Sequence, residues 1–203
     1  YPLAYVAGSA QFFVNGVLQP APTVTAGPPL SLSGMAVPAG GSGVLLYEAV
    51  PTAYAPRGPE ATIRNTAAVT GGGLVTPRTA TATVQQESRS DLSIRKALSP
   101  AAVAENGQLT YTFAVENAGT AAALAGDALV LSDTFDPRLS NLAVTLNGTA
   151  LAEGTDYTYD ATTGRFATTA GRITVPAATY TQNTDGTWAV NPGSAVLTVT
   201  GTV

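Results

Sequence analysis

The chain of 203 residues contains no cysteine and no histidine. Without cysteine it cannot form disulfides, present a thiolate nucleophile or build a zinc–cysteine site. Without histidine it lacks the commonest general base and the commonest metal ligand, which excludes most hydrolase triads and nearly all transition-metal sites. We therefore expect that the protein is not an enzyme and has no resident cofactor.

Charge is also scarce: 11% of the residues are charged and the net charge is −4, against the ~25% that is usual in soluble domains. No basic patch is present, so nucleic acid is not an expected partner. No apolar run reaches the roughly 18 residues that a membrane span needs. No signal peptide opens the chain, and Tyr1 is expected to be a position inside a longer protein.

The residues that are abundant favour β-structure. The chain has 21 glycines and 14 prolines, which break helices, and many threonines and valines, whose β-branched side chains suit strands. Its 45% of hydrophobic residues argues against disorder. The composition therefore predicts an all-β fold.

Turn signals between short alternating runs predict hairpins. Apolar arms flank Asn15-Gly16 in QFFVNGVL and Asn147-Gly148 in AVTLNGTAL, and Asn-Gly supplies the two positive-φ positions of a type I′ turn. The segment Tyr157–Phe166 predicts a further hairpin with a longer loop. The run Ala121–Ala125 lies between two glycines, so we interpret it as a loop that crosses between sheets.

An internal repeat predicts two related domains. GPPLSLSGMAVPAG at Gly27–Gly40 is similar to GRFATTAGRITVPA at Gly164–Ala177, and GSGVL at Gly41–Leu45 is similar to GSAVL at Gly193–Leu197. The order is kept in both copies. The polar stretch Gln85–Ser90 is the expected boundary, which gives domains over residues 1–88 and 89–203.

Strands spaced in this way predict a β-sandwich in each copy. The first copy is expected to be incomplete on its N-terminal side. The strand-like runs Thr62–Thr70 and Thr79–Val84 of the first copy have no counterpart after Val203. Each copy would then expose an unpaired strand edge, which favours pairing with another chain.

Strand alternation places three polar residues on apolar faces. Lys96, the only lysine, shares a face with Leu92, Ile94 and Leu98 in DLSIRKAL. Asp133 shares a face with Leu129, Leu131 and Phe135 in LVLSDTF, and Asn65 shares one with Ile63, Ala67 and Val69 in TIRNTAAVT. We therefore predict that these three residues face inward.

Lysine, aspartate and asparagine on inner strand faces can form an intramolecular isopeptide bond. Burial favours the neutral amine as a nucleophile, and a protonated carboxylic acid can polarise the asparagine carbonyl. The amine then displaces ammonia. The alternative is that the lysine stem covers apolar surface with its head in water, while the aspartate and asparagine satisfy backbone groups.

Several segments resemble the conserved repeat of bacterial surface proteins called domain of unknown function eleven. They are DLSIRKALSP at Asp91–Pro100, QLTYTFAVENAG at Gln108–Gly119, VLSDTFDPRL at Val130–Leu139 and IRNTAAVTG at Ile63–Gly71. The resemblance implies two tandem Ig-like β-sandwich domains, the first of them truncated. It also implies an extracellular, cell-surface location and a structural role as a stalk or spacer. The implied partners are neighbouring repeat domains or other copies of the chain.

In related fimbrial domains the matching residues form the isopeptide. The resemblance thus makes Lys96 the amine, Asp133 the acid and Asn65 the amide. Lys96 and Asp133 belong to the second copy, however, and Asn65 belongs to the first. An intact bond within one domain is therefore not expected in this chain.

Two further groups of residues are candidate sites. Asp156 and Asp160, close to Glu153, and Asp185 offer oxygen ligands for Ca²⁺, but solvated turns explain them as well. Five aromatic residues could line the face of an adhesin or carbohydrate-binding module that takes a host or glycan ligand, but strand alternation favours core positions and cross-strand pairs for them. They are Tyr111, Tyr157, Tyr159, Tyr180 and Trp188.

Overall fold

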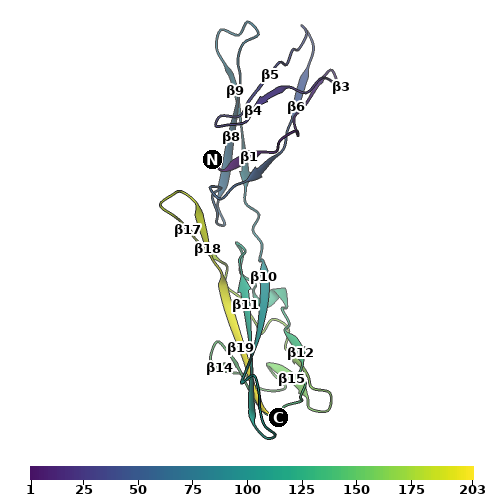
Figure 1. Cartoon of the computed structure of the whole chain (residues 1–203), viewed down its shortest axis with the longest axis vertical. Helices are drawn as coiled ribbons and strands as arrows, with labels where there is room; N and C mark the ends of the chain where they lie inside the picture. Colours follow the sequence, from purple (N-terminus) through teal and green to yellow (C-terminus); the bar gives the residue numbers. More distant parts are fainter. The chain divides into compact units, whose positions relative to one another are not determined.

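The computed structural model describes residues 1–203 and is all-β (Figure 1). Strands hold 48% of the residues, which confirms the predicted fold class, and the antiparallel sheets are consistent with a β-sandwich. The only helical element is the 3₁₀ turn η1 (Ala125–Asp127). None of the helical structure is long and apolar enough to cross a membrane.

The chain divides into two compact units. The first comprises Tyr1–Arg57, Ala61–Gln85 and Gln182–Trp188. The second comprises Gly58–Glu60, Gln86–Thr181 and Ala189–Val203. The main division along the chain therefore falls after Gln85, at the start of the polar stretch.

Two antiparallel sheets build the second unit. The larger has the strand order β10-β11-β19-β13-β14 and the smaller has the order β12-β16-β15. The larger sheet contains β10 (Leu92–Ser99), β11 (Gln108–Asn117), β13 (Ser140–Leu146), β14 (Thr149–Ala150) and β19 (Gly193–Thr202). The smaller sheet contains β12 (Ser132–Thr134), β15 (Tyr157–Asp160) and β16 (Arg165–Thr168), and a separate hairpin joins β17 (Thr179–Gln182) to β18 (Trp188–Asn191).

The core of the second unit lies between these sheets. Alternate residues of β11 are buried, from Leu109 to Asn117, as the period of two predicts. Aromatic rings fill much of the space, with the centroids of Tyr111 and Phe135 at 4.8 Å and those of Tyr157 and Phe166 at 5.3 Å. Such ring pairs stabilise a core beyond the area that they bury.

The first unit consists of shorter sheets. Its strands are β1 (Leu3–Tyr5), β2 (Gln11–Val14), β3 (Val17–Leu18), β4 (Thr23–Thr25), β5 (Ser31–Ser33), β6 (Gly43–Leu46), β7 (Ala49–Pro51), β8 (Thr62–Val69) and β9 (Arg78–Gln85). They pair as β1-β7, β3-β2-β6, β4-β5 and β8-β9. Its buried apolar residues are only Ala10, Phe12 and Ala55, so this unit has a much smaller core.

The two Asn-Gly hairpins form as predicted and share one device. Asn15 and Asn147 have φ of 48° and 49°, and the glycine after each is also at positive φ. The Asn15 side chain accepts a hydrogen bond from the Ser42 amide at 2.9 Å, and the Asn147 side chain accepts one from the Val196 amide at 2.8 Å. Each turn is therefore tied to a segment further along the chain, Asn15 to the residue before β6 and Asn147 to β19.

The longer hairpin also forms, between β15 and β16. It requires Gly164 (φ 74°), since a Cβ there would lie 2.4 Å from the Phe135 carbonyl oxygen. The Ala121–Ala125 segment is mainly a crossing, as expected: Ala123 bridges to Val175, and only its last residue enters η1.

Candidate functional site at the open edge of the second unit

The strand β10 is an edge strand whose inner face is only partly covered. Leu92, Ile94, Lys96 and Leu98 lie opposite the core-facing residues of β11 in the register. Although they face inward, Ile94 is 58% exposed and Leu98 is 46% exposed. Nothing in this unit pairs with the outer edge of β10. The sandwich is therefore open along this side.

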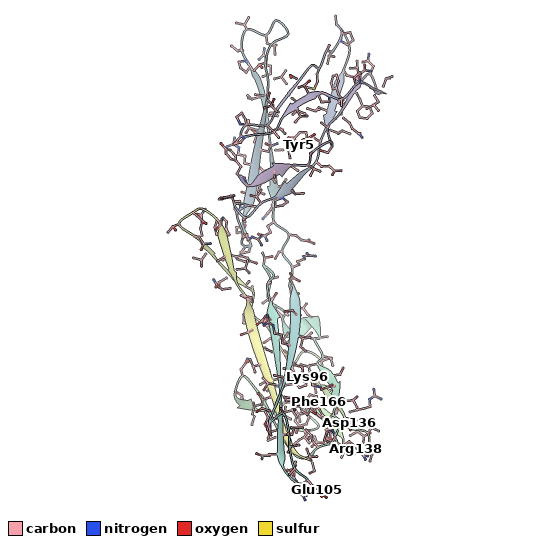
Figure 2. All side chains as sticks on the ribbon, in the orientation of Figure 1. Tyr5, Lys96, Glu105, Asp136, Arg138 and Phe166 are labelled. Atoms are coloured by element: carbon pink, nitrogen blue, oxygen red, sulfur yellow. The ribbon has the colours of Figure 1, made fainter.

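Lys96 and Asp133 meet at this opening. The Lys96 ammonium forms an ion pair with Asp133 Oδ2, which joins β10 of one sheet to β12 of the other. The same ammonium lies 4.7 Å from the ring centroid of Tyr111 and 5.6 Å from that of Phe113. Both residues face inward as the alternation predicts, and Phe166, which lies opposite Asp133 in the register, can be located with Lys96 in Figure 2.

The Asp133 carboxylate depends on this ion pair. Its Oδ2 atom is buried and accepts no other hydrogen bond. The Lys96 side chain remains 43% exposed. The lysine thus lays its stem on the apolar and aromatic surface while its charge neutralises the carboxylate, a combination that cation–π contact reinforces.

Asn65 is not part of this arrangement. It lies on β8 in the first unit and is exposed, so the prediction that it faces inward is wrong: no second layer covers this face of the β8–β9 pair. Its side-chain nitrogen is 3.4 Å from the Tyr47 hydroxyl. The structure therefore brings together two members of the proposed isopeptide triad within one unit and leaves the third in the other unit. The covalent chemistry stays a prediction.

A groove of about 320 Å³ lies beside the ion pair, between the edge strands β10 and β12. Its lining is mostly apolar, with Leu92 and Ile94 from β10 and Val130 and Leu131 from the segment before β12. Core residue Ile173 also lines it. The groove therefore opens onto the apolar interior of the unit.

The carboxylates considered as calcium ligands lie in separate turns with partners of their own. Asp160 accepts hydrogen bonds from Thr162 and Thr163, which lower the pKa of its carboxyl to about 2. Asp185 accepts from Thr187, which also lowers its pKa. Asp156 forms an ion pair with Arg172 at 3.0 Å. No group of three or more acidic side chains that could hold a metal ion is present.

Of the five aromatic residues proposed for a ligand face, two are buried in the core, whereas Tyr159, Tyr180 and Trp188 are partly exposed. Tyr111 and Tyr157 are buried, and burial is the main cause that raises the pKa of the Tyr157 hydroxyl. Tyr159 is half-buried and its hydroxyl donates to the Leu139 carbonyl at 2.9 Å. Tyr159 also lines a hollow of about 620 Å³ on the smaller sheet, together with Asp160 and Arg165.

Sequence reasoning missed Asn117, the most connected polar side chain of the second unit. It is completely buried at the end of β11. Its side-chain oxygen accepts from the amides of Asp91 and Gly119, and its nitrogen donates to the carbonyls of Ala121 and Pro176, all within 2.9 Å. The available signal was its position, the one polar residue in the inward row of β11.

No protein-family model, no curated protein and no solved structure matches the chain. The geometry of the second unit and the motifs of the sequence are therefore the basis for a functional proposal.

Proposed function

We propose that this chain is a non-catalytic structural spacer of a bacterial cell-surface or secreted protein. The motif resemblance supports the cellular setting. The observation that carries the proposal is the position of the two ends of this unit relative to strand β11, because that position decides how a pulling force acts on the sheet. Force enters this unit from the linker before β10 and leaves it through the end of β19.

These two points lie at opposite ends of strand β11, which lies between β10 and β19 in the sheet. Leu92, at the start of β10, is opposite Asn117, whereas Thr202, at the end of β19, is opposite Gln108. A pull along the chain therefore slides β10 and β19 along β11 in opposite directions. It loads the whole eight-residue ladder of β10 and the whole ten-residue ladder of β19 together, instead of opening them one hydrogen bond at a time.

Side-chain contacts reinforce this path at the end where force enters. Asn117 accepts a hydrogen bond from the Asp91 amide, directly before β10, at 2.9 Å. Arg89 donates its amide to the Thr120 hydroxyl at 3.2 Å, and that hydroxyl donates to the Glu87 carbonyl at 2.8 Å. The chain that leads into β10 is thus fastened to the loop after β11, which suits a load-bearing role.

Single-molecule pulling on the chain through its two ends tests the proposal. We expect the second unit to unfold in one cooperative event at a higher force than the first unit, whose sheets are short and whose core is small. Unfolding of the second unit at forces no higher than those of the first unit would contradict the spacer role.

A binding module is the second candidate, and the hollow beside Tyr159 favours it. That hollow combines an aromatic ring with the carboxylate of Asp160 and the guanidinium of Arg165, which are groups that carbohydrate sites use. A glycan array decides between the two candidates. A spacer gives no saturable signal, whereas a module gives one that Tyr159→Phe or Asp160→Asn reduces.

A further inference from the structure

The second unit carries an acceptor surface that nothing in the unit covers. It combines the free hydrogen-bonding edge of β10, the exposed inward side chains of Ile94 and Leu98, and the apolar groove that reaches Ile173. An uncovered edge strand with apolar side chains is a template for an added strand. This surface needs a β-strand with one apolar face.

The first unit carries a segment with that property, the hairpin β8–β9. One face of this hairpin is formed by Ile63, Asn65, Ala67, Val69, Ala80, Ala82 and Val84, with Arg78 at its end opposite Val69. The other face holds threonines, Arg64, Ala68 and Gln85. The apolar face is largely bare, with Val69 63% exposed and Val84 64% exposed, and neither strand pairs with any strand except its partner in the hairpin. The hairpin therefore has one mainly apolar and exposed face, and strand addition would exchange the contact of Asn65 with the Tyr47 hydroxyl for a new one.

The positions of polar residues in the two surfaces match. The inward row of β10 is apolar except for Lys96, and the row of β8 that contains Ile63 is apolar except for Asn65. With Asn65 opposite Lys96, Ile63 and Ala67 lie opposite Ile94 and Leu98 whichever way the strand runs, because side chains alternate with a period of two. An asparagine amide beside Lys96 and Asp133 would then supply a hydrogen-bond donor and acceptor to the ion pair that lies next to the groove.

We propose that the groove between β10 and β12 binds the β8–β9 hairpin of a second copy of this chain by strand addition. Because donor and acceptor are different surfaces, each chain can give its hairpin to one neighbour and receive one from another. Such a contact is heterologous and joins copies head to tail. The inference goes beyond the proposed spacer function, since it concerns association in solution and needs no mechanical load.

The test uses two variants that each remove one surface. Ala67→Asp places a charge on the apolar face of the donor hairpin, and Ile94→Asp places one in the acceptor groove. We expect the mass of the unmodified chain, measured by light scattering, to rise with concentration, whereas each variant alone stays at the monomer mass. An equimolar mixture of the two variants is expected to form a 1:1 dimer, since it retains one intact donor and one intact acceptor.

Matched controls place the same charge on the opposite faces. Ala68→Asp and Ala97→Asp lie next to these strand rows but point away from the proposed contact, and both should associate as the unmodified chain does. Amide hydrogen exchange gives a readout without any variant, because the edge amides of β10 should become protected as concentration rises. A chain that stays monomeric at all concentrations, or a mixture that does not dimerise, overturns the proposal.

Discussion

The Lys96 ammonium and the Asp133 carboxylate form an ion pair that joins the edge strands β10 and β12 across the open side of the second unit. The carboxylate oxygen in this pair is buried and accepts nothing else. The lysine, in contrast, is partly exposed. The buried oxygen of the Asp133 carboxylate therefore needs Lys96 as its partner, whereas the Lys96 ammonium can also be solvated by water.

This asymmetry predicts how the stability of the second unit responds to one substitution at Lys96 and to a second one at Asp133. Lys96→Met leaves a buried carboxylate oxygen unpaired and should lower the free energy of unfolding of the second unit by about 1–3 kcal/mol. Lys96→Met combined with Asp133→Asn should recover part of that loss, because the remaining group is neutral. Urea denaturation measures both effects, and a loss that the second substitution does not reduce would contradict the dependence of Asp133 on Lys96.

Asn117 is predicted to be the most sensitive polar position. Asn117→Ala removes four hydrogen bonds, those from the amides of Asp91 and Gly119 and those to the carbonyls of Ala121 and Pro176. We expect a loss of about 3 kcal/mol or more in urea denaturation. Asn183→Ala is the matched control, since that side chain is exposed and hydrogen-bonds only to Thr187; an equal effect of the two substitutions would refute the role of Asn117.

Gly164 is predicted not to tolerate alanine. A Cβ at this position would meet the Phe135 carbonyl oxygen at 2.4 Å, and the φ of 74° is itself unfavourable for alanine. We expect Gly164→Ala to lower the melting temperature of the second unit. Gly148→Ala is a useful comparison, because its φ is similar but nothing lies within 4 Å of a Cβ there, so the difference between the two isolates the steric clash.

The turn that contains Asp160 predicts a dependence on pH. Hydrogen bonds from Thr162 and Thr163 lower the pKa of Asp160 from 3.8 to about 2. Because the folded state has the lower pKa, the stabilisation by this carboxylate is present above pH 3.8 and is lost as the pH falls toward 2. An NMR titration of the Asp160 carboxyl measures the value, and Thr162→Val should move it up toward 3.8.

The position of Asn65 predicts the mass of the protein. Lys96 is paired with Asp133 in the second unit, and Asn65 belongs to the first unit. We expect intact-mass measurement of the chain to give the full mass of the sequence. Loss of the mass of one ammonia molecule, absent from Lys96→Met, would reveal a covalent bond from Lys96 and contradict this expectation.

Local rules predicted much of this fold. The Asn-Gly turns are specified by residues adjacent in sequence, and the inward positions of Lys96 and Asp133 follow from alternation along single strands. The structural importance of Asn117 and Gly164 could not be predicted from local rules. It arises from contacts with Pro176 and Phe135, which are distant in sequence. The aspartates considered as calcium ligands were likewise resolved only by the partners that the turns bring to them.

The most direct test of the spacer role compares two pulling axes in the second unit. The absence of cysteine allows specific attachment. Ser88→Cys with a cysteine added after Val203 loads β10 and β19 in shear along β11. Ala102→Cys with the same added cysteine pulls from one end of β11 and opens the ladders stepwise. Forced unfolding reports the unfolding rate under load. We predict a clearly higher unfolding force along the first axis, and equal forces along the two axes would contradict the account.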